Sequence, residues 1–280
     1  MTIREKKQWL TGRLEEGGVE DAGYEAMLLV ELVYGMDRTA QLIHSQDPAP
    51  EEKNAQLEEL LSRRLEGEPI QYLLGQWEFM GLPFLLSQDT LIPRADTETL
   101  CQWVLDHTTK KESCRMLDLC CGSGCIGISL AYYLPKAEVE LWDISAGAVE
   151  MTKKNAALNG VESRCTPKVQ DVLKEDLREG CFDYILSNPP YIPTGDLAGL
   201  QKEVQREPRR ALDGGETGMD FYEVLPGLHK HLLKEGGVLL FECGIHQSQQ
   251  VAEIMRREGY REIEEINDLH GIPRVVLGRK

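Results

Sequence analysis

The segment Ser-Asn-Pro-Pro-Tyr-Ile-Pro, residues 187–193, could hold a planar amino group. It follows an apolar run, so we expect Asn188 to lie at the end of a strand. The prolines fix the backbone and offer carbonyl acceptors without competing N–H donors, and Pro190 stiffens the loop. The Asn188 side-chain oxygen and the Pro189 carbonyl could each accept one hydrogen of an NH₂ group, and Tyr191 could stack on it. Such acceptors would stabilise the charge that develops when this weak nucleophile attacks a methyl donor.

The segment Leu-Asp-Leu-Cys-Cys-Gly-Ser-Gly-Cys-Ile-Gly, residues 117–127, has the GxGxxG spacing of a nucleotide-binding turn. Gly122 permits a tight turn and Gly124 lets a ligand approach the backbone. Gly127 could allow the following helix to pack closely. The spacing alone fits NAD, FAD or an adenosyl ligand, and a glycine-rich turn without a ligand is an alternative.

Acidic residues at the ends of predicted strands indicate which ligand is favoured. Asp143 could accept both hydroxyls of a ribose, and Asp171 could meet an adenine amino group or, alternatively, cap a helix. Asp118 lies inside a predicted buried strand, where its carboxylate needs a partner. It would repel a pyrophosphate but attract the ammonium and sulfonium of S-adenosylmethionine. The acids therefore favour S-adenosylmethionine as cofactor, with S-adenosylhomocysteine as product.

Strand and helix patterns alternate after about residue 97. The expected strands are residues 115–120, 138–144, 165–171, 182–187 and 237–243, and the expected helices include 126–134, 146–160 and 219–236. This alternation predicts an α/β fold with a mostly parallel, doubly wound sheet. Residues 260–280 predict two further strands around a turn, which could form an antiparallel edge. The loop at Asn188 would then lie at the switch point of the sheet, where ligands bind.

The N-terminal quarter of the chain has a different pattern. Residues 1–75 place apolar residues three and four apart, which is typical of helices. Gly67 and Pro69 end the last long helix, and residues 76–96 predict a linker with short extended pieces. We therefore expect a small helical domain over residues 1–75 and an α/β domain over residues 97–280.

Composition limits the classes of partner. The chain has 31 basic and 47 acidic residues, a formal charge of −16, which disfavours a nucleic-acid substrate and suits a protein partner. It has no apolar run long enough to cross a membrane and no signal peptide, so we expect a cytoplasmic protein. Eight cysteines without a CxxC pair predict reduced thiols, and the histidines form no ligand cluster, so no metal site is expected.

The motifs together resemble the peptide chain release factor glutamine methyltransferases, the PrmC/HemK family. The segments that carry the resemblance, in family order and spacing, are GEPIQYLLGQWEFMGLPF, LIPRADTE, LDLCCGSGCIG, DIS, SNPPYIP, EPRRALDGGETGMDFY and FECGIHQ. The resemblance implies a class I S-adenosylmethionine-dependent methyltransferase domain with a Rossmann-like fold, preceded by a helical domain that helps to hold the substrate. It implies methylation of the side-chain amide nitrogen (N5) of the glutamine in the Gly-Gly-Gln loop of class 1 release factors, in translation termination.

The resemblance also implies roles for single residues. Gly122, Asp143 and Asn188 match cofactor contacts of the family. Asn188 and Pro189 match its amide-orienting pair, and Tyr191 matches its stacking residue. Arg94, Glu98 and Glu207 fall in family motifs without an assigned role, and Arg94 could simply pair with Asp96 or Glu98.

The chain departs from the family pattern in two places. Cys120 and Cys121 stand where glycine and threonine are usual, and Ala95 replaces a common proline. We expect the turn to bind the cofactor provided that Cys120 need not adopt a positive φ.

Three other functions would use part of these motifs. An adenine-N6 nucleic-acid methyltransferase would share Asn188 to Tyr191 but should bring a basic face. A nicotinamide-dependent oxidoreductase would use the glycine turn but leaves the proline loop unexplained. A catalytically silent scaffold would bind the adenosyl ligand without transferring a methyl group.

Overall fold

The computed structural model describes all 280 residues, which divide into two compact units. The N-terminal unit comprises Met1–Gly75 together with Gln201–Arg206. The α/β unit comprises Gln76–Leu200 and Glu207–Lys280. The chain therefore enters the N-terminal unit a second time, in the middle of the α/β part of the sequence.

The N-terminal unit is helical, as its periodicity predicts. Its helices are α1 (Ile3–Glu16), α2 (Ala22–Tyr34), α3 (Arg38–Ile43), α4 (Asn54–Leu65) and α5 (Ile70–Leu74). A capping box formed by Thr2 and Glu5 starts α1, and Gly35 ends α2 in the left-handed conformation. Leucines from α1, α2 and α4 form its core, including Leu10, Leu14, Leu29, Leu57 and Leu61.

The α/β unit contains one hairpin and one large sheet. The hairpin pairs β1 (Gln76–Phe79) with β2 (Leu82–Leu85). The sheet strands are β3 (Cys114–Leu119), β4 (Ala137–Asp143), β5 (Cys165–Val169), β6 (Phe182–Ser187), β7 (Leu233–Glu242), β8 (Arg261–Asn267) and β9 (Pro273–Arg279). Their order is β5-β4-β3-β6-β7-β9-β8. The pairs from β5 to β7 are parallel, whereas β9 is antiparallel to both of its neighbours, β7 and β8. The predicted parallel sheet with an antiparallel edge is confirmed.

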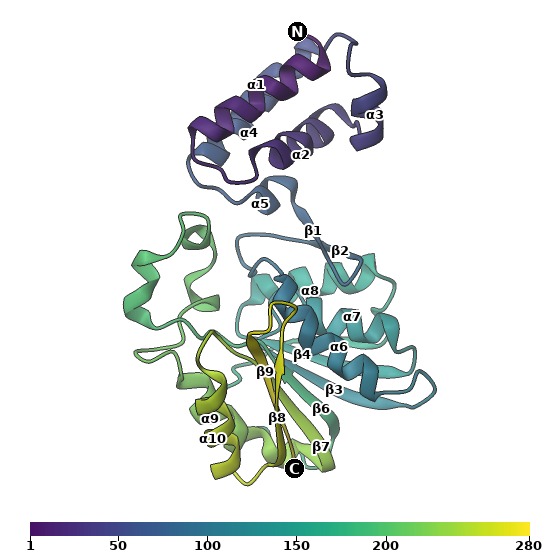
Figure 1. Ribbon diagram of the computed structural model, residues 1–280. Coiled ribbons are helices and arrows are strands. Elements are labelled where there is room, and N and C mark those ends of the chain that lie inside the picture. The colour runs from purple at the N-terminus through teal and green to yellow at the C-terminus, as the bar shows by residue number, and fades with distance from the viewer. The chain divides into compact units, whose positions relative to one another are not determined.

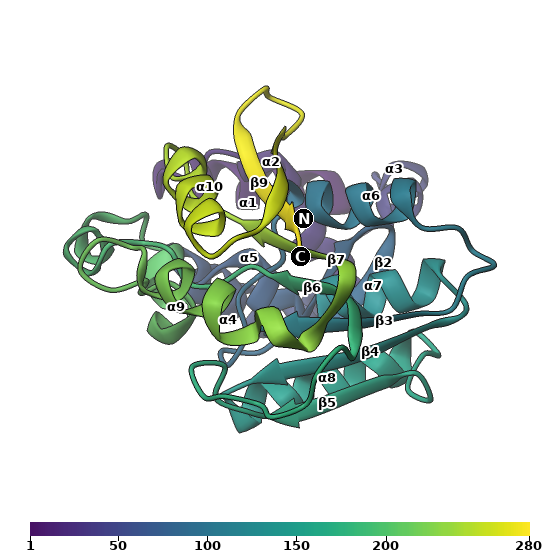
Figure 2. The same cartoon turned by 90° about the horizontal axis from the view of Figure 1, so that it is seen from below.

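Helices cover both faces of this sheet (Figures 1 and 2). One face packs against α6 (Glu98–His107), α7 (Cys125–Tyr133) and α8 (Ala146–Leu158). The other packs against α9 (Asp220–His229) and α10 (Ser248–Arg257). Neighbouring residues on β3 point to opposite faces, Met116 to the first core and Leu117 to the second. Both faces of the central strands are therefore apolar, which is typical of a parallel sheet.

One predicted helix is wrong at its C-terminal end. The pattern of residues 219–236 predicts a single helix, but α9 ends at His229 and β7 already begins at Leu233. Leu233 pairs with Phe182 of β6, and both side chains are completely buried. Strand pairing at this position therefore overrides the helical spacing of the leucines.

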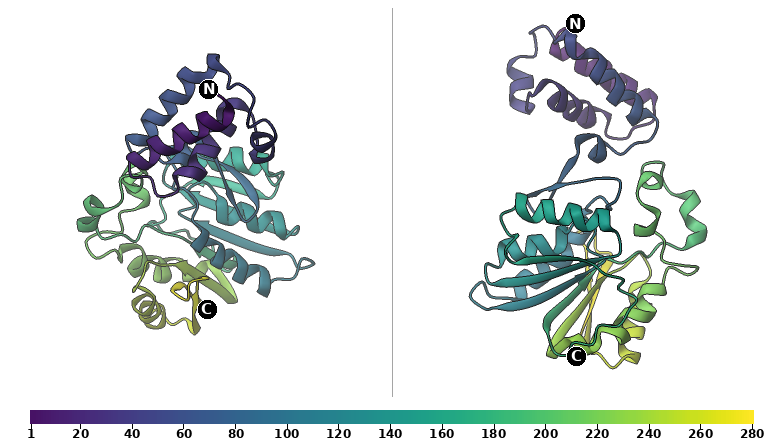
Figure 3. Two further views of the ribbon diagram at one scale, coloured as in Figure 1. Left: turned by 45° about the horizontal axis from the view of Figure 1, so that its top comes forward. Right: turned by 180° about the vertical axis from the view of Figure 1, so that it is seen from behind.

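The longest connection follows β6. Between Ser187 and α9 the chain forms only short 3₁₀ turns, at Thr194–Gly199, Val204–Arg206 and Arg209–Ala211 (Figure 3). Loops of this length are usually functional, and this one begins with the proline segment.

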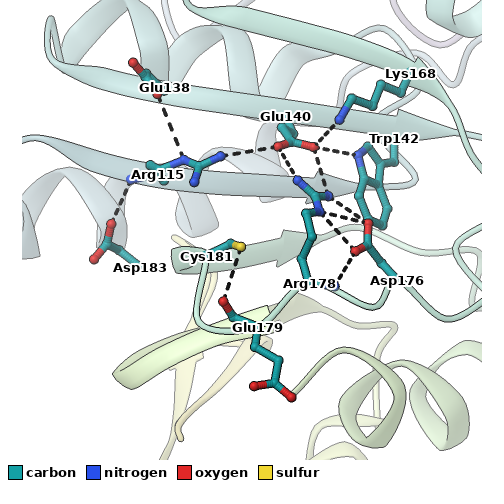
Figure 4. Close-up of polar contacts among 10 residues, drawn as sticks. All are labelled: Arg115, Glu138, Glu140, Trp142, Lys168, Asp176, Arg178, Glu179, Cys181 and Asp183. Carbon is teal, nitrogen blue, oxygen red and sulfur yellow. Dashed lines mark hydrogen bonds and ion pairs between the residues drawn. The ribbon is translucent and has the colours of Figure 1, made fainter. Parts of the chain in front are cut away.

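A charge network fixes the loop between β5 and β6 (Figure 4). Glu140 on β4 accepts hydrogen bonds from Lys168 Nζ at 2.6 Å and Arg178 Nη1 at 2.7 Å. Arg178 also donates to Asp176 at 2.8 Å and lies over the ring of Trp142. Burial alone would raise the pKa of Glu140, but the hydrogen bonds from Arg178 and Lys168 lower it. Glu140 therefore stays ionised and anchors the loop to the sheet.

The helices of this chain are too short or too polar to cross a membrane. All eight cysteines are free thiols.

Candidate active site

The glycine turn joins β3 to α7 and has a left-handed backbone at three residues. The φ angles are +60° at Cys120, +54° at Gly122 and +80° at Gly124. From the sequence, cofactor binding is expected provided that Cys120 need not adopt a positive φ. That condition is not met, because this L-residue does adopt a positive φ. A Cβ atom at Gly124 would lie 2.7 Å from Thr152 Cγ2, so that position has no room for a side chain.

The other two glycines of the motif differ in their surroundings. A Cβ atom at Gly127 would lie 2.8 Å from Leu141 Cδ2, so Gly127 lets α7 pack closely on β4, as predicted. A Cβ atom at Gly122 would meet no atom within 4 Å. The space beside Gly122 is therefore open to a ligand.

Asp143 ends β4 beside this turn. Its Oδ2 accepts a hydrogen bond from Gly122 N at 2.9 Å and its Oδ1 accepts one from Ser145 N at 2.8 Å. Burial raises the pKa of Asp143, while these amides and the charge of Arg210 act in the opposite direction. Each carboxylate oxygen keeps one lone pair free for a further donor, such as a hydroxyl group.

Asp118 is completely buried below the turn and does not line the cavity. Its Oδ2 accepts a hydrogen bond from Gly127 N at 2.9 Å, at the N-terminus of α7, whereas its Oδ1 has no partner. Burial raises the pKa of Asp118 to about 7, against the effect of the Gly127 hydrogen bond. The sequence predicts that this carboxylate needs a partner. Gly127 N supplies one for Oδ2, and Oδ1 has none.

A cavity opens at the carboxyl ends of β3, β4 and β6. Its walls include the turn residues Cys120 to Ser123, the acids Asp89, Asp143 and Asp171, the apolar residues Ile144, Val172, Leu173 and Phe221, and the loop residues Asn188 and Pro190. Ile144 is 60% exposed and Leu173 is 48% exposed, which leaves apolar surface uncovered at the cavity wall. Such surface suits a flat aromatic ligand.

Asn188 lies on the cavity wall at the switch point between β3 and β6. Its side-chain Nδ2 donates a hydrogen bond to Thr97 Oγ1 at 3.2 Å. No protein donor is bonded to its Oδ1, which is therefore available as an acceptor. Ser187 holds the preceding strand end by donating to the Leu119 carbonyl at 2.8 Å.

The residues after Asn188 are placed differently from one another. Pro190 lines the cavity, whereas Pro189 and Tyr191 do not. Tyr191 packs against the core below α9 and α10, and burial raises the pKa of its phenol. Its carbonyl accepts a hydrogen bond from Gln247 Nε2 at 3.0 Å. In this structure Tyr191 is therefore set back from the cavity rather than forming its surface.

Asp171 and Arg94 have partners that the sequence did not identify. Asp171 lines the cavity and accepts a hydrogen bond from Leu173 N in a turn, so it caps no helix. Arg94 lines the cavity and pairs with Glu207, not with Asp96 or Glu98. Glu207 also accepts a hydrogen bond from Ile92 N at 3.0 Å, so this pair ties together segments far apart in the sequence.

Several residues of the site are not predicted from the sequence. Ile144 directly follows Asp143, and its position beside a predicted ribose acceptor could have indicated it. Thr97 and Arg210 also lie on the cavity wall. They belong to the segments LIPRADTE and EPRRALDGGETGMDFY, but the resemblance assigns neither residue a role. His229 is buried, and its Nε2 bonds to the Val172 carbonyl at 2.7 Å, which supports the cavity loop from behind.

The cavity fits an adenosine-bearing ligand with a positively charged end. Asp143 can accept hydroxyl donors, Ile144 and Leu173 offer apolar surface, and the turn at Gly122 has room for a close approach. The buried, unpartnered oxygen of Asp118 favours positive charge near the turn.

Comparisons with known proteins agree with this arrangement. Residues 5–75 match the model of the PrmC N-terminal domain, and residues 94–218 match that of the methyltransferase small domain. The chain is 40% identical over 279 residues to a release factor glutamine methyltransferase of Geobacter sulfurreducens, covering 99% of this chain and 96% of the relative. It is 39% identical to the protein of the same name from Moorella thermoacetica, covering 99% and 98%.

Solved structures support the fold. The catalytic domain of hMettl16, crystallised with an RNA hairpin, has a TM-score of 0.58 and 15% identity, covering 81% of this chain and 80% of that one. A methyltransferase from Pyrococcus furiosus has a TM-score of 0.52 and 16% identity, covering 81% and 98%. At such identities these likenesses show the fold alone.

Proposed function

The chain belongs to the release factor glutamine methyltransferase family, and from this premise we propose its reaction. We propose that it uses S-adenosylmethionine to methylate the side-chain amide nitrogen (N5) of the glutamine in the Gly-Gly-Gln loop of class 1 release factors. The reaction would take place in the cytoplasm and serve translation termination.

The observation that carries the proposal is the free acceptor of Asn188. Its Nδ2 is engaged by Thr97, which leaves Oδ1 for a ligand on the cavity wall. Because Pro189 and Pro190 fix the backbone, the acceptors in this loop are held in place before the substrate arrives. This pattern suits an NH₂ group better than a hydroxyl or a thiol, because an NH₂ group has two hydrogens to donate.

The residues would act on the amide as follows. Asn188 Oδ1 would accept one hydrogen of the glutamine NH₂, and the Pro189 carbonyl would accept the other. Because Pro189 does not line the cavity, its carbonyl would need to turn towards the substrate. The two acceptors would direct the nitrogen lone pair towards the methyl carbon. S-adenosylmethionine supplies the methyl group and leaves as S-adenosylhomocysteine. The N–C bond forms as the S–C bond breaks, and the nitrogen then loses one proton to solvent. Because positive charge grows on the nitrogen during attack, these acceptors bind the transition state more tightly than the substrate.

The cofactor would be held by the residues around the glycine turn. Asp143 would accept the ribose hydroxyls, Ile144 and Leu173 would enclose the adenine, and Asp171 would meet its amino group. Asp118, from below the turn, would favour the positive charge of the methionine part. Tyr191 would need to move towards the substrate to stack on the glutamine amide, since its ring is packed in the core.

The decisive experiment follows the label from S-adenosylmethionine. The purified protein is incubated with the labelled cofactor and a class 1 release factor, its Gln-to-Ala loop variant, or a DNA or RNA oligonucleotide. We expect label on the release factor alone. Label on the loop variant would contradict the assigned acceptor, and label on nucleic acid would favour the adenine-N6 alternative.

Asn188→Ala tests the role of the acceptor. We expect it to lower kcat by about 100-fold, in the range found when one preorganised hydrogen-bonding group is removed. Affinity for S-adenosylhomocysteine should stay within about threefold, because Asp143 and the glycine turn remain. Asn267→Ala, at an exposed position of β8, serves as the control and should leave turnover unchanged. Normal turnover by Asn188→Ala would exclude the mechanism.

A further inference from the structure

The segment Phe-Glu-Cys-Gly-Ile-His-Gln, residues 241–247, has no role in the reaction proposed so far. It begins at the end of β7 and lies against the segment from Asn188 to Tyr191. Gln247 Nε2 donates to the Tyr191 carbonyl at 3.0 Å, and Gln247 Oε1 accepts a hydrogen bond from Gly244 N at 2.8 Å. Gln247 therefore fixes the backbone at Tyr191, the C-terminal end of the segment from Asn188 to Tyr191.

Glu242 lies at the other end, below Asn188. Its side chain is 1% exposed, and its Oε2 has no hydrogen-bond partner. The backbone of Glu242 is fixed, because its carbonyl accepts a hydrogen bond from Tyr222 Oη at 2.8 Å and β9 pairs with it through Val275. The carboxylate is therefore held at a defined place inside the protein.

Thr97 lies between this carboxylate and the cavity. Its side chain is 2% exposed and accepts the hydrogen bond from Asn188 Nδ2. Strand register places Glu242 one position beyond Phe241, the partner of Ser187, and so beside Asn188. Thr97 and Asn188 both lower the pKa of the Glu242 carboxyl. The amide of Asn188 thus presents its NH₂ to Thr97, on the side of Glu242, and leaves its oxygen free on the cavity wall.

A buried carboxylate at this position is expected to lower the stability of the protein. A buried charge without full pairing lowers stability, and a neutral side chain could fill the same volume. Arg274 lowers the pKa of Glu242 but does not compensate its charge fully, because Arg274 pairs with Asp96 at 2.9 Å and with Asp268 at 3.4 Å. Some property of the negative charge itself must therefore be useful.

We propose that Glu242 is a positioning residue that, with Thr97, holds the Asn188 amide in the one orientation that directs its oxygen towards the substrate NH₂. The inference rests on the proposed function, since it assigns the support of that same acceptor. A rotation of the Asn188 amide by half a turn would place an NH₂ against the NH₂ of the substrate and repel it. A carboxylate accepts hydrogen bonds only and therefore excludes that rotation. Hydrogen bonding of Nδ2 to the acceptors also polarises the amide and makes Oδ1 a stronger acceptor.

The carboxylate can do this only while it is ionised. Burial raises the pKa of Glu242 to about 7; Thr97, Arg274 and Asn188 lower it, and Asp96 raises it. The other titratable groups that interact with Glu242 are Cys101, Cys125, Tyr191, Tyr222 and Cys243, whose pKa values are all raised, so that they are neutral near pH 7. Below pH 7 Glu242 gains a proton, becomes a possible donor, and no longer fixes the amide. At saturating substrates, kcat should therefore fall as the pH is lowered through about 7.

The test compares wild type, Glu242→Gln and Glu242→Asp in the full-length protein. We expect Glu242→Gln to lower kcat about tenfold, a loss in keeping with a slightly misplaced reacting group. KM for the release factor and affinity for S-adenosylhomocysteine should each change less than about twofold. The decrease in kcat below pH 7 should vanish in Glu242→Gln and persist in Glu242→Asp, which retains the charge.

Asp183→Asn is the matched control, because Asp183 lies at the opposite end of β6 and pairs with Lys234 at 2.8 Å. It should alter stability without changing kcat or its pH profile. Unchanged kcat in Glu242→Gln, or the same acid limb in that variant, would overturn the proposal.

A second measurement does not depend on activity. In protein labelled with ¹⁵N at asparagine, the side-chain NH₂ signals of Asn188, assigned through Asn188→Ala, should shift with a midpoint near pH 7. The shift should be absent in Glu242→Gln. If wild type methylates no release factor, the proposed function fails while this titration still tests the positioning role. If wild type is active and the titration survives in Glu242→Gln, the positioning role alone is wrong.

Discussion

At the scale of single residues, Cys120 shows how the turn tolerates an unfavourable side chain. Its φ of +60° costs an L-residue about 1–2 kcal/mol relative to the right-handed region. Neighbouring contacts hold the conformation, because Cys121 N donates to the Trp142 carbonyl at 3.0 Å and Gly122 N donates to Asp143. The departure from glycine at this position therefore changes the energy of the turn and leaves its hydrogen bonds in place.

Cys120→Gly and Cys120→Val should have different effects. Glycine removes the backbone strain but loses the packed sulfur and gains freedom in the unfolded chain, so the free energy of unfolding should change by less than about 1 kcal/mol. Valine is β-branched and poorly suited to positive φ, so it should lower the free energy of unfolding by about 2 kcal/mol or more. Urea denaturation measures both changes.

Cys165→Val is the control for the change from cysteine to valine, because Cys165 lies in β5, where valine is favourable. Cys165→Val should change the free energy of unfolding by less than about 1 kcal/mol. If Cys120→Val were equally well tolerated, the strain assigned to Cys120 would be absent.

Asp118 should link cofactor binding to pH. Burial raises the pKa of its carboxyl to about 7, so the cofactor-free protein is largely protonated at pH 6 and largely ionised at pH 8. A cationic ligand at the turn favours the ionised form, so binding near pH 6 must release a proton. If only the ionised form binds, affinity for S-adenosylmethionine should rise up to about tenfold from pH 6 to pH 8.

Isothermal titration calorimetry in buffers of different ionisation enthalpy measures this proton release. Asp118→Asn should bind more weakly and without the pH dependence, whereas Glu242→Gln should retain it. Proton uptake, or an affinity that is constant with pH in wild type, would rule out the link to Asp118.

At the scale of elements, local patterns predicted the parts of the site that lie on one short segment. The turn at Gly122, Asp143 at a strand end and Asn188 before prolines could be found because each is fixed by its own neighbours along the chain. The strands at 182–187 and 260–280 were found for the same reason. The spacing of Leu233 predicts a helix, and only its pairing with Phe182 makes it a strand residue.

Contacts between segments far apart in the chain were not predicted from the sequence. Thr97 reaches Asn188 across 91 positions, and Glu207 reaches Ile92 across 115. Neither contact leaves a periodic pattern, because each joins segments outside the strands and long helices, and the course of those segments depends on the whole sheet. The role of Glu242 was not predicted either, because the buried run that ends β7 gives no indication of what its last residue faces.

At the scale of the whole molecule, the chain passes between the two units three times, at Gly75, Leu200 and Arg206. Residues 201–206 lie within the connection that starts at the proline segment, yet they are part of the N-terminal unit. There Glu203 accepts a hydrogen bond from Arg64 Nη1 at 2.9 Å, and the Glu66 carbonyl accepts one from Arg206 at 3.0 Å. The loop that presents the amide acceptors therefore continues into a segment whose place depends on the stability of the N-terminal unit.

Arg64 is the residue that ties residues 201–206 to the helices of the N-terminal unit through Glu203. It also binds Glu25 at 2.6 Å and 3.1 Å, and both side chains are at most 10% exposed. Arg64→Met should leave Glu25 buried without a partner and lower the free energy of unfolding of the N-terminal unit by about 3 kcal/mol. Hydrogen exchange measured by mass spectrometry should show the loss in peptides from α2, α4 and residues 201–206.

The neighbouring Arg63 provides a matched control, because its pair with Glu68 is 43% exposed on the arginine side. Arg63→Met should lower the free energy of unfolding of the N-terminal unit by less than about 1 kcal/mol. The double variant Glu25→Leu/Arg64→Met should recover most of the stability, since it removes the unpaired charge rather than half of a pair. Affinity for S-adenosylhomocysteine should be the same in all three variants, because the cofactor residues lie in the α/β unit. Equal protection from hydrogen exchange in Arg64→Met and Arg63→Met would show that the buried pair does not hold residues 201–206. A loss of cofactor affinity in Arg64→Met would show that the two units do not fold independently.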